Sequence, residues 1–393
     1  MPAFSGAALL CAAALAGGTA AAAAAPGPEQ QFNTAVKQLR AGRSGDALST
    51  LESLTRAEPN FRLAQLFYGE LLAALSGRGV SALLTGEIDG DPRLSELAEE
   101  ARVRLASETA VPGPGMLPNA VLQLAQGFEH AIVVDLPRAR LYLLKNDGGA
   151  LSLERHHYAA MGRNGAGKQT AGDMRTPVGL YHIQRWIDDK ALPELYGAGA
   201  LPLDYPNAWD TLQLRTGSGI WLHGVPRDTY SRPPRSSEGC VTMANADLES
   251  LRSYVRFGRT PVVLSDELEW VPAAAVESER ADFLRRIDDW RRKWSAIDTD
   301  GYLAYYADDF TMDGMDRAAF AAHKRRVNAG KSFIDIRLSD TSLFRYPGAG
   351  SSVMVAEFTM EYSSDNYAVT TRKQQFWRRD DAGSWKIVRE INR

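Results

Sequence analysis

The chain has 393 residues, a formal net charge of −3, 45% hydrophobic residues and 24% charged residues. This length exceeds what a single hydrophobic core ordinarily supports, so we expect several domains. The composition is that of a soluble globular protein. Because the charge shows no basic excess, nucleic acid is excluded as a partner.

The N-terminus is predicted to be an export signal. Residues 6–18 form an apolar run too short to span a bilayer, and the Ala-rich stretch after it offers small-residue cleavage sites. No Lys or Arg precedes the run, which departs from the usual signal pattern. We predict a signal peptide over residues 1–25, a location in the periplasm or cell envelope, and no membrane span in the rest of the chain. Cleavage removes Cys11 and leaves Cys240 without a disulfide partner.

Residues 26–110 are predicted to form a helical module. Apolar residues recur at helical spacing in three segments, which Gly42, Gly45 and Pro59 delimit. The pattern resembles a tetratricopeptide-type helix pair, although only one and a half units are visible. A packing module and a peptide-binding module both fit it. The Pro- and Gly-rich residues 111–115 then mark a linker.

The apolar pattern changes to strand-like spacing at about residue 131. Short strands are expected at 131–134, 140–144 and 261–264, so the middle of the chain is predicted to be mostly β. The interval between Trp186 and Trp209 is rich in Pro, Tyr, Trp and Gly and lacks periodicity. We expect an ordered loop there that covers a binding site.

Residues 276–393 are predicted to form an α+β domain. Helices are expected over 283–297 and near 317–329. Strands are expected at 332–344, 352–362, 367–379 and 384–391. Helices followed by a meander of strands indicate helices packed on one curved sheet.

Two kinds of ligand site are rejected. Residues 162–168 satisfy G-x-x-x-x-G-K, but Gln169 stands where a phosphate loop needs Ser or Thr, and no helix start follows. The histidines outside the Cys240 region show no metal-ligand spacing. We therefore expect neither a metal nor a cofactor.

Cys240 and His223 are the candidate catalytic residues. A lone cysteine is commonly a small buried hydrophobe, but a thiol with a nearby imidazole can serve as a nucleophile, and we expect His223 to lie close enough to keep the sulfur ionised. The carbonyl of Gly224 can accept a hydrogen bond from the other ring nitrogen. Gly239 permits a tight turn that directs the N–H groups of Gly239 and Cys240 toward a developing oxyanion.

At these positions the chain resembles the L,D-transpeptidase (YkuD-type) family of peptidoglycan enzymes. The resemblance lies in His-Gly at 223–224, Ser-Glu-Gly-Cys at 237–240 and Asn-Ala-Asp at 245–247, within about residues 128–270. It implies a YkuD-type catalytic domain over 119–270. Separately, Asn245 is expected to cap a helix that runs through residues 248–251.

Two departures from the family pattern concern substrate binding. Glu238 replaces the second histidine of Ser-His-Gly-Cys, which leaves His223 as the base. Thr242 replaces an arginine that the family associates with the substrate carboxylate. Ser237, Glu238 and Thr242 are the expected substrate-binding residues.

The C-terminal residues resemble an NTF2-like domain, through Tyr-Tyr-Ala-Asp-Asp-Phe at 305–310 and Trp-Lys-Ile-Val at 385–388. A YkuD-type domain followed by an NTF2-like domain resembles the cell-shape L,D-carboxypeptidase branch, in which water replaces the amine acceptor. The NTF2-like cone would hold a small ligand or glycan in a pocket, or enclose a filled core.

The resemblance implies an exported cysteine acyl-transfer enzyme that remodels the cell wall. Its partners would be peptidoglycan tetrapeptide stems, attacked by Cys240 to give a thioester that passes to an amine (transpeptidation) or to water (carboxypeptidation). The alternative is a catalytically degenerate envelope scaffold that binds through its two end domains, which the altered Ser-Glu-Gly-Cys sequence would suit.

Overall fold

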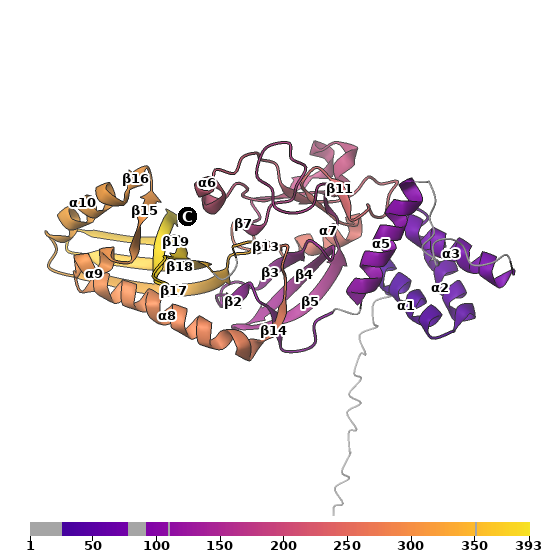
Figure 1. Ribbon diagram of the computed structural model, residues 1–393, viewed down its shortest axis with the longest axis horizontal. Coiled ribbons are helices and arrows are strands. Elements are labelled where there is room, and N and C mark those ends of the chain that lie inside the picture. Colours follow the sequence, from indigo (N-terminus) through magenta and orange to yellow (C-terminus); the bar gives the residue numbers. More distant parts are fainter. Residues whose placement is uncertain (1–25, 78–91, 109–110, 350–351) are drawn as a thin grey trace, which may run out of the picture.

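The structure is a computed structural model that describes residues 26–77, 92–108, 111–349 and 352–393. In chain order it contains a helical unit, a β-rich middle unit and a C-terminal unit of helices on a sheet, arranged along the long axis of the molecule (Figure 1). This is the predicted fold class. The predicted signal peptide and Cys11 lie outside the described residues.

The helical unit consists of α1 (Pro28–Arg40), α2 (Ser44–Ala57), α3 (Arg62–Leu75) and α5 (Pro92–Glu108). Its core is formed by apolar residues that recur at helical spacing in the sequence. They include Phe32, Ala35, Ala47, Leu51, Leu54, Phe61, Leu63 and Ala64. The helical prediction is confirmed, whereas the tetratricopeptide character stays a prediction.

The middle unit is built on a five-stranded sheet of order β5-β4-β3-β13-β7. Its strands are β3 (His130–Asp135), β4 (Arg140–Asp147), β5 (Ala150–Tyr158), β7 (Gly179–His182) and β13 (Pro261–Ser265). Strands β3 and β13 run parallel and the other neighbours run antiparallel. Nearly every residue of β3 and β13 is buried, because both faces of these central strands are covered.

A second sheet of order β12-β10-β9-β8 packs on the first through a shared core that includes Ile132, Leu141, Leu201, Leu222, Val241 and Val262. Its strands are β8 (Ile187–Asp188), β9 (Gly199–Pro202), β10 (Trp221–His223) and β12 (Val241–Thr242). A separate pair joins β6 (Met161–Gly162) to β11 (Arg235–Ser237), and the helix α7 (Asn245–Arg252) follows β12.

The interval between Trp186 and Trp209 is more structured than predicted. It contains β8, the short helices η1 (Asp189–Ala191) and η2 (Glu194–Tyr196), β9 and the start of α6 (Ala208–Leu212). Elements of two to four residues are too short to produce a periodic apolar pattern, so the sequence indicated only a loop.

The C-terminal unit packs helices on a seven-stranded sheet of order β16-β15-β20-β19-β18-β17-β2. The helices are α8 (Ala273–Ser295), α9 (Thr299–Leu303) and α10 (Arg317–Asn328). The strands are β15 (Tyr306–Met312), β16 (Met315–Asp316), β17 (Ile334–Arg345), β18 (Val353–Ser364), β19 (Tyr367–Arg379) and β20 (Trp385–Asn392). Aromatic side chains of α8 meet the sheet, as where the rings of Trp290 and Phe358 lie 5.9 Å apart. The predicted helices and four strands are confirmed, whereas β15 and β16 were not predicted.

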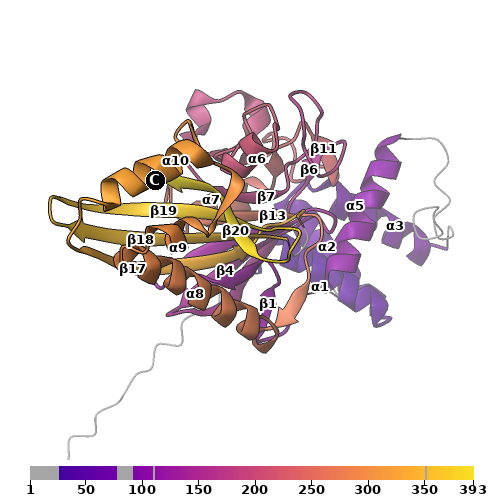
Figure 2. The same cartoon turned by 60° about the vertical axis from the view of Figure 1, so that its left-hand side comes forward.

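The middle and C-terminal units share backbone and core. Strand β2 (Val121–Gln123) pairs with β17 and so belongs to the C-terminal sheet, although it lies within the residues predicted for the catalytic domain. Strand β1 (Met116–Pro118) pairs with β14 (Trp270–Pro272). One hydrophobic cluster includes Val133, Leu180 and Val263 from the middle unit and Phe344, Val355, Phe376 and Val388 from the C-terminal unit. Both views place β7 and β13 beside the C-terminal sheet (Figures 1 and 2).

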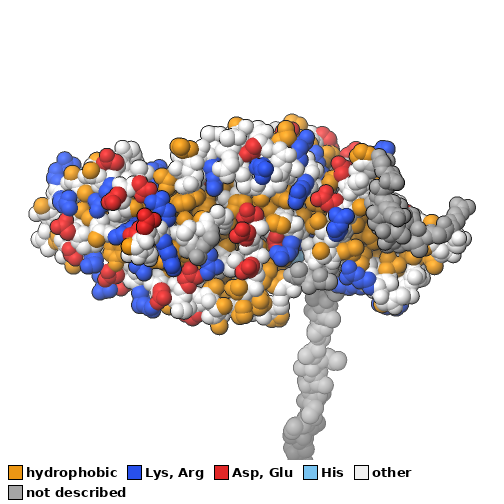
Figure 3. All heavy atoms as spheres, in the orientation of Figure 1, with side chains coloured by type: hydrophobic (Ala, Val, Ile, Leu, Met, Phe, Trp, Pro, Cys, Tyr) orange, Lys and Arg blue, Asp and Glu red, His pale blue; other side chains and the backbone are white. Residues whose placement is uncertain are grey.

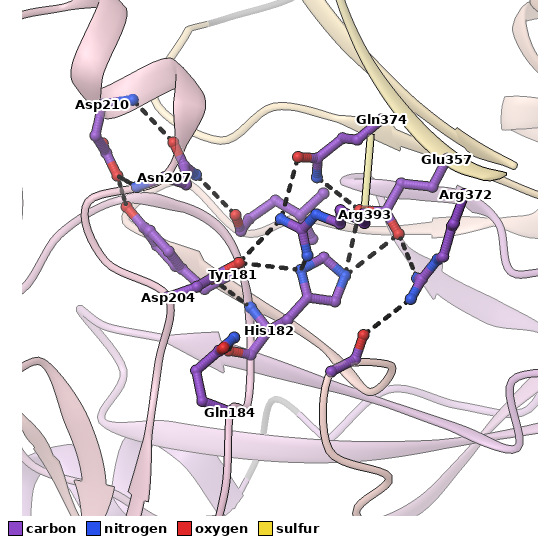
Figure 4. A network of polar contacts seen from close by, with 12 residues as sticks. Tyr181, His182, Gln184, Asp204, Asn207, Asp210, Glu357, Arg372, Gln374 and Arg393 are labelled. Atoms are coloured by element: carbon purple, nitrogen blue, oxygen red, sulfur yellow. Dashed lines mark hydrogen bonds and ion pairs between the residues drawn. The ribbon is translucent and has the colours of Figure 1, made fainter. Parts of the chain in front are cut away.

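A buried polar network completes this junction (Figure 4). Glu357 of β18 accepts hydrogen bonds from Gln374 at 2.6 Å and Arg372 at 3.0 Å, and lies 3.2 Å from His182 Nε2 at the end of β7. Arg393 bridges His182 and Asp204. Burial alone would raise the pKa of Glu357, but the cationic and hydrogen-bonding neighbours, His182 first, lower it to about 2. A buried polar network centred on the Glu357 carboxylate therefore joins the two units beside their shared hydrophobic core.

No helix in the described ranges is both long enough and apolar enough to cross a bilayer. On the face in Figure 3, acidic and basic side chains are interspersed, in keeping with the small net charge.

Glu357→Gln should lower the free energy of unfolding by about 3 kcal/mol. The new amide NH₂ would face N–H donors that now donate to the carboxylate, and the positive charge of Arg372 would lose its buried counter-ion. Chemical denaturation gives the free energy of unfolding. Glu361→Gln, at an exposed position on the same strand, is the matched control and should change it by less than about 0.5 kcal/mol. Equal unfolding curves for the two variants would contradict the role of the network.

Candidate active site

The second sheet brings His223 and Cys240 into one cavity. Strand β10 ends at His223 and runs parallel to β12, with Leu222 opposite Val241 and His223 opposite Thr242. Cys240 stands directly before β12, so this register places it level with Trp221 at the start of β10, two residues before His223. Both side chains line a cavity of about 560 Å³.

The imidazole of His223 is held in one orientation and one tautomer. Its side chain is 3% exposed, and Nδ1 lies 2.7 Å from the Gly224 carbonyl oxygen, as the sequence predicted. A carbonyl oxygen only accepts, so Nδ1 carries the proton and Nε2 keeps a free lone pair. The ring of Tyr196 packs edge-on at 4.8 Å. Burial, together with the charge of Arg232, lowers the pKa of His223 to about 4, so the ring is a neutral base near pH 7.

The thiol of Cys240 is protonated in this arrangement. Its Sγ donates to the Gly219 carbonyl oxygen at 3.4 Å, and burial raises its pKa to about 11. The expectation that His223 keeps the sulfur ionised is therefore wrong for the resting state, because a neutral buried imidazole provides no positive charge to offset the desolvation of a thiolate. The cavity thus holds a protonated thiol and a neutral imidazole.

The turn before Cys240 is held by Ser237. The Ser237 hydroxyl donates to the Cys240 carbonyl oxygen at 2.6 Å and accepts from the Gly239 N–H at 3.1 Å. Gly239 has φ +130°, and a Cβ there would lie 2.8 Å from the Arg175 carbonyl oxygen, so this position requires glycine. The N–H of Gly239 is thus already hydrogen-bonded, which corrects the prediction that it is free for an oxyanion. The N–H of Cys240 makes no hydrogen bond with the described residues.

The three predicted substrate-binding residues are placed differently. Ser237 and Glu238 line the cavity, Ser237 as a buried part of the turn and Glu238 as an exposed carboxylate. Thr242 is 1% exposed, lies outside the cavity lining and exchanges backbone hydrogen bonds with Ala160. The prediction that Thr242 binds substrate is therefore wrong, because its side chain is enclosed in the sheet.

Asn245 positions the segments around the site and does not cap a helix. It is the first residue of α7, and Ala244 occupies the cap position without a side-chain hydrogen bond. The Asn245 Oδ1 accepts from the Ala198 N–H at 2.9 Å and the Val225 N–H at 3.1 Å, and Nδ2 donates to the Val225 carbonyl oxygen at 2.9 Å. The predicted cap is wrong; Asn245 instead ties the chain after His223 to the segment before β9.

The segment between Trp186 and Trp209 does cover the site, as expected. Leu195 and Tyr196 of η2 line the cavity, and Leu195 is 45% exposed. The sequence missed three cations in the same lining: Arg163, Lys168 and Arg232. Arg163 and Lys168 are distant in sequence from the Cys240 motif, and Arg232 precedes Ser237 by five residues without belonging to the motif, so no local pattern marks them. Lys168 pairs with Asp173 at 2.7 Å, which accounts for the lysine of the rejected phosphate-loop pattern.

The helical unit holds the loop at 225–234, which connects His223 to the strand before Cys240. The Tyr230 ring stacks on Phe61 at 4.1 Å, and Ser231 donates to Glu100 at 2.7 Å. Asn60 donates to the Arg227 carbonyl oxygen at 3.2 Å and accepts from the Tyr230 N–H at 3.2 Å. These contacts pack the helical unit against the loop that forms one wall of the active-site region.

Comparison with protein families matches both predicted domain types. Residues 129–264 match the L,D-transpeptidase catalytic domain (YkuD), and residues 282–391 match the Cds6 C-terminal NTF2-like domain. The chain thus carries a catalytic domain of the L,D-transpeptidase family followed by an NTF2-like domain.

Solved structures share this arrangement. Bd1075 of Bdellovibrio bacteriovorus is 26% identical over 70% of this chain and 98% of its own, with a TM-score of 0.63. The helical cell shape determining protein Pgp2 of Campylobacter jejuni is 23% identical over 75% of this chain and 99% of its own, with a TM-score of 0.57, and its K307A mutant aligns with the same TM-score. No curated protein matches the chain by sequence.

Alkylation of Cys240 by iodoacetamide should be slow at neutral pH and should accelerate toward a midpoint near the thiol pKa of about 11. The thiolate is the reactive form, and burial disfavours it here. Rates are measured by peptide mass mapping across pH, so that only Cys240 is scored. A midpoint below about 7 would show a preformed thiolate–imidazolium pair and contradict the neutral resting state.

Asn245→Ala should lower the free energy of unfolding by about 3 kcal/mol, because backbone groups of Ala198 and Val225 lose their partners. The control is Asn164→Ala, which removes one exposed hydrogen bond to the Asp173 carbonyl oxygen. Denaturant titration that gives both variants the same midpoint would refute the positioning role of Asn245.

Proposed function

We propose that this protein is a cysteine acyl-transfer enzyme that acts on the tetrapeptide stems of peptidoglycan in the cell envelope. The observation that carries the proposal is the placement of Cys240 and a tautomer-locked His223 in one cavity. The match of residues 129–264 to the L,D-transpeptidase catalytic domain supports the substrate class. Export is supported by the apolar, Ala-rich N-terminal sequence. The proposed domains are those of the sequence: 26–110, 119–270 and 276–393.

The acylation step follows from the protonation states. His223 Nε2 takes the thiol proton as Cys240 Sγ bonds to the carbonyl carbon of the third stem residue. The negative charge that develops on the carbonyl oxygen is stabilised by the Cys240 N–H, and a donor of this kind contributes roughly 3 kcal/mol in other enzymes. Collapse breaks the carbon–nitrogen bond, and the proton on His223 passes to the departing D-alanine amine. A thioester on Cys240 remains.

Deacylation uses the same base. His223 takes a proton from the acceptor, the acceptor oxygen or nitrogen bonds to the thioester carbon, and the carbon–sulfur bond breaks with return of a proton to Cys240. Water as acceptor gives a tripeptide, and an amine of a second stem gives a cross-linked dimer.

A second candidate is a binding scaffold without turnover. The protonated thiol and the exposed Glu238 in place of a family histidine favour it. Acylation by a carbapenem separates the candidates, because an acyl-transfer enzyme gains the mass of the drug at Cys240 and a scaffold does not.

Incubation of the protein with disaccharide tetrapeptide should give tripeptide or cross-linked dimer in mass spectra of the products. Cys240→Ala should lower the rate of product formation by at least about 1,000-fold, because the nucleophile is lost. Ser253→Ala, an exposed position on the protein surface, should retain full activity. Turnover that survives in Cys240→Ala would refute the proposed nucleophile, and no product from the unaltered protein would favour the scaffold.

A further inference from the structure

The active-site cavity carries an excess of positive charge. Its lining contains the side chains of Arg163, Lys168 and Arg232, against the single carboxylate of Glu238. Lys168 already has a partner in Asp173. For Arg163 and Arg232, no carboxylate among the described residues lies within ion-pair distance. Two guanidinium groups therefore face the same cavity without a counter-ion from the described chain.

Both arginines are held by their backbones, which leaves their side chains available. The Arg163 N–H donates to the Ser237 carbonyl oxygen at 2.8 Å, so the residue is tied to the turn that presents Cys240. The Arg232 carbonyl oxygen accepts from the Tyr158 hydroxyl at 2.8 Å. Arg232 also follows Ser231, which the helical unit holds through Glu100.

The two arginines lie within electrostatic range of each other and of the reacting groups. Burial and the charge of Arg163 lower the pKa of Arg232. After burial and the Gly224 hydrogen bond, Arg232 is the next influence on the pKa of His223, and it lowers that value. Arg163 is exposed and Arg232 is half-buried, and two like charges near each other are stabilised when an anion binds between them. The two guanidinium groups therefore favour an anion in the cavity that Cys240 also lines.

We propose that Arg163 and Arg232 form a subsite for the C-terminal carboxylate of the stem peptide, a role that Thr242 cannot fill. The inference rests on the proposed function. The Cα of the leaving residue lies about 3.8 Å from the Cα of the residue that Cys240 attacks, and its carboxylate is bonded directly to that Cα. A guanidinium binds a carboxylate through paired hydrogen bonds, which suits a fixed end group. The subsite thus selects stems that end one residue after the scissile bond.

The test compares a tetrapeptide stem that ends in a free carboxylate with the same peptide ending in a carboxamide. The unaltered protein should cleave the acid with a kcat/KM about 10 to 100 times higher, which is the range expected for loss of hydrogen bonds between charged groups. In Arg163→Gln and Arg232→Gln, kcat/KM for the acid should fall by most of this factor, and kcat/KM for the amide should change little. Both substitutions spare the backbone hydrogen bonds described above.

Arg235→Gln is the matched control, since Arg235 is exposed three residues after Arg232 and lies outside the cavity lining. It should keep the full preference for the acid. A second readout is calorimetric binding to the Cys240→Ala protein. Its affinity for the acid should exceed its affinity for the amide, and the affinity for the acid should fall when Arg163→Gln or Arg232→Gln is combined with Cys240→Ala.

An acid-to-amide ratio that stays unchanged in Arg163→Gln and Arg232→Gln, in both turnover and binding, would overturn the subsite while leaving the acyl-transfer proposal intact. If the unaltered protein cleaves neither peptide, the proposed function fails, and equal binding of acid and amide to the Cys240→Ala protein would overturn the subsite independently.

Discussion

The parallel pairing of β10 with β12 is the constraint on which the site depends. This register sets His223 opposite Thr242 and places Cys240 level with Trp221, two residues before His223 on the neighbouring strand. The Gly224 carbonyl then fixes the imidazole tautomer, and the Ser237 hydroxyl fixes the turn at Gly239. Because burial favours the neutral form of both groups, the proposed chemistry requires transfer of the thiol proton to His223 at the moment of attack.

The outer units contribute to this geometry through packing. The helical unit braces the loop that carries Arg232, through the stacked rings of Phe61 and Tyr230. The C-terminal unit shares a hydrophobic core with the central strands and takes β2 into its own sheet. The buried Glu357 network closes the same junction. The three units therefore contact one another through side chains and shared strands, although their apolar patterns are separate in sequence.

Structural features that depend on residues close together in the chain could be predicted from the sequence. Strands β17 to β20 are each eight or more residues long and rich in β-branched and aromatic residues, so their limits were nearly correct. The spacing of His223, Gly224 and Cys240 follows a family motif. Non-local features could not be predicted in this way. Arg163 and Arg232 meet only because β6 pairs with β11, and β2 joins a sheet whose other strands follow residue 305. Asn245 fits a helix-cap pattern, yet its side chain serves two distant backbone segments.

The most direct test of the central claim is the mass of the enzyme during turnover. Rapid acid quench of the protein with disaccharide tetrapeptide, followed by peptide mapping, should show the disaccharide tripeptide attached to Cys240 as a thioester. His223→Gln should slow its formation strongly, because the neutral base is gone. Release of product with no modified Cys240 at any time point, or unchanged acylation in His223→Gln, would contradict the account.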